Sequence, residues 1–197
     1  MEIEELKMID TLIKLDGDIL LWIQDNLRAD WLDPIIKAIT YLGNGGIFWI
    51  LVCILLMLIK KTRATGAVCS CSLAVTFLIN NLILKNVIAR VRPYEAIESL
   101  TRIIGAQSDF SFPSGHSGAS FAVAVVIFME MPKKYGIPAV ILAFLIALSR
   151  LYVGVHYPSD VIAGIATGTV YAVICVMVYR KFFKDRCSAV SEQNETN

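Results

Sequence analysis

Three short groups of residues between positions 85 and 160 combine cations, histidines and an aspartate at fixed spacings. The groups are Lys85 with Arg92-Pro93, then Pro113-Ser114-Gly115-His116, then Ser149-Arg150 with His156 and Asp160. The chain contains two histidines, and both belong to these groups. Ionisable groups beside apolar segments cost free energy, so their clustering indicates a functional site.

The three cations of these groups can surround one polyanion. Arg92 and Arg150 offer planar forks that match phosphate oxygens, and Lys85 adds a point charge. Taken alone, a lysine or arginine at such a position more often extends from a helix end toward the membrane surface. The combination predicts a phosphate-binding site.

The second group has the pattern of a helix start. Pro113 suits the first turn, so Ser114, Gly115 and His116 would lie at the helix N-terminus. Free N–H groups and the positive end of the helix dipole bind anions there, and glycine permits close approach. Taken alone, the same pattern is that of an ordinary helix start.

The two histidines can divide the work of phosphoryl transfer. Pro158 begins another helix with Asp160 in its first turn, where Asp160 can accept a hydrogen bond from the His156 ring. The other ring nitrogen of His156 is then free to attack phosphorus, while His116 can donate a proton to the leaving oxygen. This arrangement predicts phosphoryl transfer through a phosphohistidine.

A zinc site is the alternative use of two histidines and an aspartate. Three cations beside a Zn²⁺ ion would repel it, and none of the five cysteines lies near a histidine at zinc-ligand spacing. We therefore expect neither a metal nor another cofactor.

The composition is that of an integral membrane protein. Hydrophobic residues make up 56% of the 197 residues, charged residues only 18%, and the mean hydropathy is +0.65. The formal net charge of +1 creates no field that attracts polyanions, which argues against a nucleic-acid partner. The length allows one membrane-embedded domain.

Five apolar segments are long enough to be membrane-spanning helices. They are residues 42–59, 65–84, 114–131, 136–152 and 160–179. Basic residues follow the first, third and fifth segments, which places those loops in the cytoplasm. The chemical groups would then lie on the outer face, where five basic residues depart from the expected charge bias: Lys85, Arg90, Arg92, Arg102 and Arg150.

The predicted organisation is an all-α transmembrane bundle of five to six spans. Residues 1–41 have the near-helical apolar spacing of amphipathic helices at the interface, or of a tilted sixth crossing. Residues 42–186 form the transmembrane domain that carries the three groups, and residues 187–197 form a polar, disordered tail. Gly164 and Gly168 can serve close helix packing inside the monomer or a dimer face, and we favour the first.

The three groups together match the signature K-x6-RP, PSGH and SR-x5-H-x3-D at every position. The chain thereby resembles the type 2 phosphatidic acid phosphatase (PAP2) family. The resemblance implies that Lys85, Arg92 and Arg150 hold phosphate oxygens, with Ser114 and Gly115 adding a hydroxyl and backbone donors. It also implies that His116 is the general acid, that His156 is the nucleophile, and that Asp160 is the carboxylate that orients His156. The implied fold is an all-α bundle related to vanadium haloperoxidases.

The resemblance implies hydrolysis of a lipid phosphate or diphosphate at the extracytoplasmic face of the plasma membrane. Among small bacterial members we expect an undecaprenyl diphosphatase, with phosphatidylglycerophosphate or phosphatidic acid as alternative substrates. The loop between the first two groups is either the place of headgroup contacts or a solvated loop. Its polar residues are Tyr94, Glu95, Glu98, Arg102 and Asp109.

Three other classes of protein remain to be weighed. A vanadium haloperoxidase shares the site but would be soluble, which the apolar segments oppose. A non-catalytic lipid-binding protein would not need both histidines and Asp160. A transporter would show internal repeats and polar mid-span residues, of which Asn80 and Asn81 are the main examples. The oligomeric state is left open.

Overall fold

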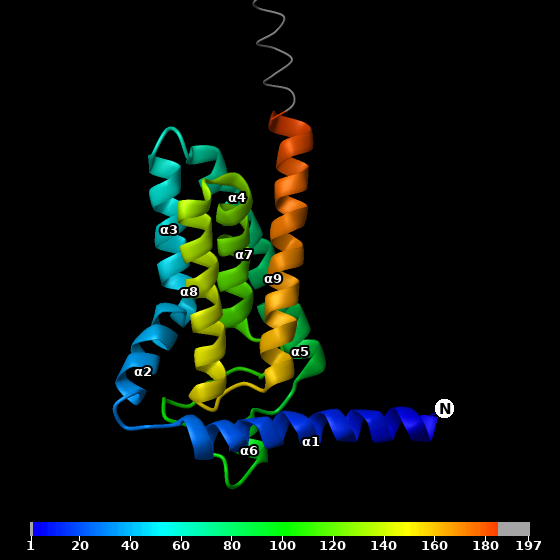
Figure 1. Cartoon of the computed structure of the whole chain (residues 1–197). Coiled ribbons are helices and arrows are strands. Elements are labelled where there is room, and N and C mark those ends of the chain that lie inside the picture. Colours follow the sequence, from blue (N-terminus) through cyan, green and yellow to red (C-terminus); the bar gives the residue numbers. More distant parts are fainter. Residues whose placement is uncertain (1, 185–197) are drawn as a thin grey trace, which may run out of the picture.

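The computed structural model describes residues 2–184, so the predicted disordered tail lies outside the described residues. Every regular element in residues 2–184 is a helix, which confirms the all-α prediction for that part of the chain. The long helices of the bundle stand side by side, and the N-terminal helix lies across their lower end (Figure 1). The upright helices are α3 (Ile47–Leu58), α4 (Arg63–Thr76), α7 (Gly115–Glu130), α8 (Lys133–Tyr152) and α9 (Pro158–Tyr179).

Helix α7 is the centre of the bundle, because it packs against α4, α8 and α9. Small and β-branched residues line it, and Ala122, Val123 and Ala124 are completely buried. The helix is enclosed by protein and has 16 residues. Neighbouring helices rather than lipid therefore surround most of this helix.

The number of helices that meet length and hydropathy requirements for a span is smaller than the five predicted. Within the described chain, three qualify: the stretch Arg63–Ala96, helix α8, and the stretch Pro158–Phe183. Helix α2 (Asp33–Leu42) and the segment Asn44–Leu58 qualify together as a pair bent by 44°. Three to four candidate spans are thus established, and five to six spans stay a prediction.

Helix α4 continues through a wide-turn segment, Phe77–Leu84, into the short helix α5 (Lys85–Ile88). The helical path ends at Ala89, whose φ of 47° is in the left-handed region. Such a conformation costs an L-residue about 1 kcal/mol or more. The turn redirects the chain at the lower end of the bundle, and the short helix α6 (Pro93–Ala96) follows.

Helices α7 and α9 approach so closely that only glycine fits at their contact. A Cβ atom on Gly164 would lie 2.6 Å from the Ser114 carbonyl oxygen, and one on Gly168 would lie 2.4 Å from the Gly118 carbonyl oxygen. These contacts confirm that the glycine pair serves packing inside the monomer. They also hold the start of α7 against the start of α9.

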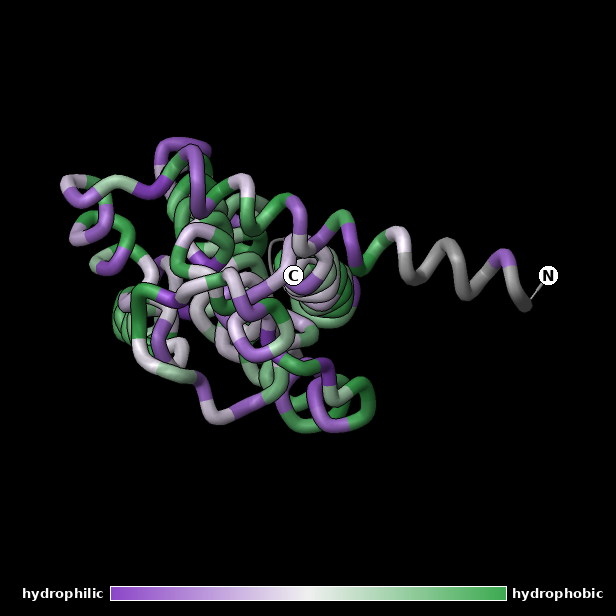
Figure 2. Tube along the Cα trace, turned by 90° about the horizontal axis from the view of Figure 1, so that it is seen from below, coloured by the Kyte–Doolittle hydropathy of each residue, from purple (hydrophilic) through white to green (hydrophobic). Residues whose placement is uncertain are grey.

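Helix α1 (Glu2–Leu27) lies across the lower end of the bundle (Figure 1). Leu20 and Ile23 are buried against the loops of this end, whereas Leu12, Ile13 and Leu15 are exposed. Figure 2, seen from this end, shows hydrophilic and hydrophobic residues alternating along α1 as it leaves the bundle. An amphipathic helix at the membrane interface stays a prediction that this arrangement suits.

Candidate active site

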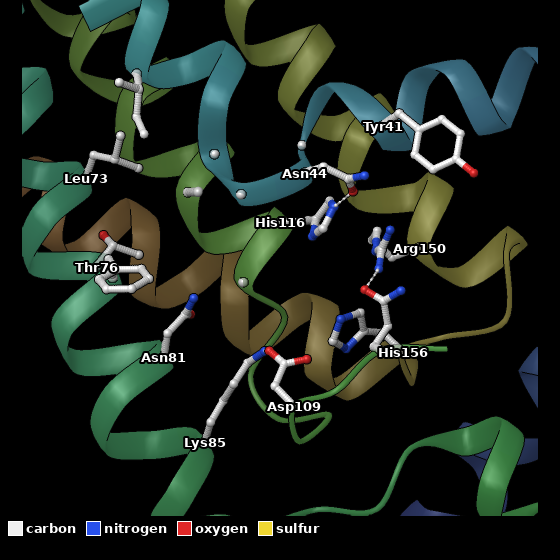
Figure 3. A pocket seen from close by; sticks show the side chains of 18 of the residues that line it. Tyr41, Asn44, Leu73, Thr76, Asn81, Lys85, Asp109, His116, Arg150 and His156 are labelled. Carbon is white, nitrogen blue, oxygen red and sulfur yellow. Dashed lines mark hydrogen bonds and ion pairs between the residues drawn. The ribbon is translucent and has the colours of Figure 1, made fainter. Parts of the chain in front are cut away.

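The lower end of the bundle brings the three sequence groups together around one cavity of about 990 Å³ (Figure 3). Six of the predicted site residues line it: Lys85, Arg92, Gly115, His116, Arg150 and His156. They come from α5, the loop after it, the start of α7, the end of α8, and the loop between α8 and α9. Asp160 and Ser114 are completely buried behind the wall.

Arg92 is fixed by the backbone around it. Its Nε donates to the carbonyl oxygen of Asp109 at 2.8 Å, and its Nη1 donates to the carbonyl oxygen of Val155 at 2.8 Å. The same Nη1 lies 3.4 Å from Nε2 of His156. The guanidinium group is therefore held beside the nitrogen that is expected to attack phosphorus.

Arg150 is completely buried at the end of α8. Its Nη1 donates to Oγ1 of Thr40 at 2.6 Å, and its Nη2 donates to Oε1 of Gln107 at 3.4 Å. Its Nε has no hydrogen-bond partner among the described residues. A buried donor without a partner costs free energy, so this guanidinium is suited to an anion that enters the cavity.

Asp109 occupies a position that the sequence did not predict. It lies in the loop between α6 and α7, where its carboxylate forms an ion pair with Lys85 (Figure 3). The same carboxylate forms an ion pair with Arg92 at 2.5 Å. Burial opposes its ionisation, but the hydrogen bonds and charges of the two cations outweigh this and lower its pKa to about 2. Two of the three expected phosphate ligands are thus paired with a carboxylate of the protein.

His156 lies between Asp160 and the cations. Its Nδ1 is 3.5 Å from Oδ2 of Asp160, and its Nε2 is directed toward Arg92. Burial, together with the charges of Arg92 and Arg150, lowers the pKa of His156 to about 3, although Asp160 acts in the opposite direction. The ring is therefore neutral at physiological pH, and a lone pair on Nε2 requires that the proton be on Nδ1, facing Asp160.

Asp160 is held by several donors at the start of α9. Its Oδ2 accepts from the Tyr157 backbone N–H at 2.9 Å and from the Ser111 hydroxyl at 2.5 Å. Its Oδ1 accepts from Nη1 of Arg90 at 2.7 Å. Sequence reasoning missed Ser111 and did not assign Arg90 a role, because their partner lies 49 and 70 positions away.

His116 and its neighbours occupy the opposite wall of the cavity. Nε2 of His116 lies 3.0 Å from Oδ1 of Asn44, which comes from the turn between α2 and α3. A Cβ atom on Gly43 would lie 2.4 Å from the His116 ring, so this turn approaches the histidine closely. The contribution of Asn44 was not predicted, because nothing in the spacing of the sequence pairs it with His116.

The Ser114 hydroxyl has a different environment from the one expected. It accepts hydrogen bonds from the Ser117 hydroxyl at 2.9 Å and from the Ser117 backbone N–H at 3.4 Å, and it thereby caps α7. Ser114 is absent from the cavity wall, whereas Gly115 forms part of it beside Asn81. Of the eight predicted residues, six therefore line the cavity, a seventh, Asp160, lies against His156, and the eighth, Ser114, caps α7.

The sequence model of the PAP2 superfamily matches residues 65–184, more than half of the chain. The chain belongs to the PAP2 superfamily. A curated relative, the undecaprenyl-diphosphatase of Sulfolobus acidocaldarius, is 34% identical over 130 residues, which are 66% of this chain and 63% of that protein. The chain thus spans less than two thirds of the length of that relative.

Two solved structures resemble this PAP2 chain. A transmembrane PAP2 type phosphatidylglycerolphosphate phosphatase from Bacillus subtilis matches with a TM-score of 0.74 and 27% identity, over 87% of this chain and 88% of that one. A bacterial vanadium-dependent iodoperoxidase matches with a TM-score of 0.65 and 18% identity, over 84% of this chain and 48% of that one. The second likeness shows the fold alone, and it confirms the expected relation to the haloperoxidase core.

One side of the cavity in this PAP2 protein is apolar. Helices α3 and α4 and the wide-turn segment after α4 contribute Ile50, Cys53, Ile54, Leu73 and Phe77 to its wall. Ile54 and Phe77 are also exposed. The cavity therefore has a cationic end near the histidines and an apolar wall formed by α3, α4 and the segment after α4.

Proposed function

We propose that this protein hydrolyses a lipid phosphate or diphosphate through a phosphohistidine intermediate. The observation that carries the proposal is the convergence of Lys85, Arg92 and Arg150 on a cavity that contains Nε2 of His156. Asp160 lies against the other ring nitrogen. This is the geometry that an activated nitrogen nucleophile requires.

In the proposed reaction, the Nε2 lone pair of His156 attacks phosphorus, and the bond between phosphorus and the leaving oxygen breaks. His116 gives its proton to that oxygen. His116 then accepts a proton from water, whose oxygen attacks phosphorus, and the bond between phosphorus and His156 breaks to release inorganic phosphate. Lys85, Arg92 and Arg150 stabilise the charge on the remaining oxygens throughout, and the backbone N–H of Gly115 is placed to assist them.

The apolar side of the cavity favours a lipid over a soluble phosphoester. A substrate with its phosphate at the cations would direct its tail past Ile50, Leu73 and Phe77 toward the bilayer. Within this class we propose undecaprenyl diphosphate, on the likeness to the Sulfolobus acidocaldarius relative. Phosphatidylglycerophosphate is the second candidate, on the likeness to the Bacillus subtilis structure, and phosphatidic acid is the third.

We further propose that the five upright helices all cross the plasma membrane and that the cavity faces outside. The end of the bundle opposite the cavity carries the short basic turns at Lys60-Lys61 and Lys133-Lys134, which favour the cytoplasm. A cysteine introduced at Gly105 should react with an impermeant thiol reagent from outside, whereas one at Lys134 should not, once native cysteines are removed. The reverse labelling pattern would place the chemistry in the cytoplasm.

The proposed activity can be tested by phosphate release from the purified protein in detergent. The panel consists of undecaprenyl diphosphate, phosphatidylglycerophosphate, phosphatidic acid and a water-soluble phosphoester. We expect release from a lipid substrate by the wild type, and none by His156→Ala. Binding of these lipids without phosphate release would instead indicate a non-catalytic lipid-binding protein. Release by His156→Ala at the wild-type rate would contradict the mechanism.

A further inference from the structure

Arg90 lies behind the cavity wall and connects two parts of the fold that are far apart in sequence. Its Nη1 donates to Oδ1 of Asp160 and to Oγ of Ser159, each at 2.7 Å. Its Nη2 donates to Oδ2 of Asp16 at 2.8 Å. Its guanidinium carbon lies 3.8 Å from the centre of the Tyr157 ring. One arginine is thus fixed between a carboxylate of α9 and a carboxylate of α1.

Asp16 is a buried carboxylate on helix α1. Its Oδ1 accepts from the Ser159 backbone N–H at 3.0 Å, and its Oδ2 accepts from the Ser159 hydroxyl. Only 7% of the residue is exposed. A buried carboxylate is costly unless it is paired, and here its partners are Arg90 and the first turn of α9. Helix α1 is therefore joined to the turn that carries Asp160.

The two oxygens of Asp160 have different partners. His156, Ser111 and the Tyr157 backbone all approach Oδ2, whereas Arg90 is the partner of Oδ1. A donor on Oδ1 fixes the rotation of the carboxylate, and so keeps Oδ2 directed at the histidine. The charge of Arg90 alone would also weaken Asp160 as an acceptor, and the second carboxylate, Asp16, offsets part of that charge.

We propose that Arg90 and Asp16 are positioning residues, which hold the Asp160 carboxylate against His156 and make α1 a part of the catalytic apparatus. This inference rests on the proposed function, because it assigns the nucleophile to His156. Neither Arg90 nor Asp16 lines the cavity. Their effect should therefore fall on turnover and not on the binding of phosphate.

The competing explanation is that these ion pairs only anchor α1. Other contacts already serve that purpose: Gln24 accepts from the Thr101 backbone N–H at 2.8 Å, and Nε of Arg28 donates to the Tyr152 carbonyl oxygen at 2.9 Å. An anchoring role predicts a lower melting temperature with an unchanged kcat of the folded enzyme. A positioning role predicts a lower kcat in enzyme that is fully folded.

The test uses the full-length protein and five variants: Asp16→Asn, Asp16→Glu, Arg90→Gln, the double variant, and Asp18→Asn. Asp18→Asn is the matched control, because the same chemical change falls two positions away on the same helix at an exposed residue. The measurements are kcat and KM with undecaprenyl diphosphate and with an aryl phosphate, the Ki of inorganic phosphate, and the melting temperature. His156→Ala is assayed in parallel.

We expect Arg90→Gln and Asp16→Asn to lower kcat, the former by roughly tenfold or more, since small displacements of a catalytic group have effects of this order. The Ki of inorganic phosphate should stay within about twofold of the wild type, because its ligands are untouched. Asp16→Glu should recover part of the loss, and Asp18→Asn should show none. The double variant should be no slower than Arg90→Gln, because Asp16 acts through Arg90.

Three results would overturn the proposal. An unchanged kcat in Asp16→Asn with a lower melting temperature would reduce the ion pair to an anchor. A loss of phosphate binding in parallel with kcat would mean that the cavity itself had collapsed. If the wild type is active and His156→Ala is inactive, either of these two results excludes the positioning role and leaves the proposed function intact. Activity of His156→Ala equal to that of the wild type would remove the proposed nucleophile, and the positioning role with it.

Discussion

Replacing Asp109 by asparagine should tighten the binding of inorganic phosphate. The Asp109 carboxylate pairs with Lys85 and Arg92, which are two of the three cations expected to hold phosphate. An incoming phosphate must displace that carboxylate before it can pair with both cations. Asp109→Asn keeps the shape of the side chain and removes its charge, so the competition is lost.

The magnitude follows from the ionisation of Asp109. Its pKa is lowered from 3.8 to about 2, a difference of about 2 units, and one unit corresponds to about 1.4 kcal/mol, which gives an upper limit near 3 kcal/mol. The side chain is 49% exposed, so solvent screening reduces the figure to roughly 1 kcal/mol. A change of about 1 kcal/mol corresponds to a Ki for phosphate about fivefold lower in the variant.

The sign of the pH dependence is also determined. A depressed carboxylate pKa stabilises the fold at pH values above the unfolded pKa near 4, and this contribution is lost as the pH falls through about 2. Asp109 is therefore ionised throughout the range in which phosphate binding is measured. The fivefold difference between the variant and the wild type should be constant between pH 5 and 8.

The assay is competitive inhibition of aryl phosphate hydrolysis by inorganic phosphate at pH 7. Glu98→Gln is the matched control, because Glu98 is an exposed carboxylate in the same loop and its replacement should leave Ki unchanged. An unchanged or higher Ki in Asp109→Asn would refute the reasoning. It would show that Asp109 orients the two cations for phosphate and does not compete with it.

Three further outcomes follow from the geometry of the site. The kcat of His116→Ala should fall roughly 10²- to 10⁴-fold with a poor leaving group and much less with an aryl phosphate, whereas His156→Ala should be inactive with both substrates. An equal loss of kcat in His116→Ala with every leaving group would exclude His116 as the general acid. Because the pKa of His156 is about 3, protonation of this ring should not lower kcat/KM between pH 5 and 8. Titration of the His156 ring near pH 6.5, measured by NMR, would contradict this prediction. Ala89→Gly should raise the free energy of unfolding by about 0.5 to 1 kcal/mol and leave turnover unchanged, because glycine adopts a φ of 47° without steric cost. A lower melting temperature of this variant would contradict strain at Ala89.

Sequence alone predicted the helical class and most of the residues that the structure brings together at the cavity. Apolar segments of span length must form helices in lipid, and Pro113 and Pro158 marked the starts of two helices close to where the structure begins α7 and α9. His156 and Asp160 are four positions apart, so their proximity is a local property of a loop entering a helix. The glycine pair Gly164 and Gly168 likewise indicated a close helix contact, which the structure provides against α7.

Tertiary structure decided which groups surround these residues. Asp16 and Asp160 share Arg90 although 144 positions separate the two aspartates, and Asn44 reaches His116 across 72 positions. Asp109 was one of several polar residues in its loop, and nothing in its spacing distinguished it from Glu95 or Glu98. The physical reason is that backbone rules act over a few residues, whereas the partner of a charge depends on how helices pack and where loops cross. The motif around Ser114 also predicted a phosphate contact for its hydroxyl. In the structure, this hydroxyl caps the start of α7.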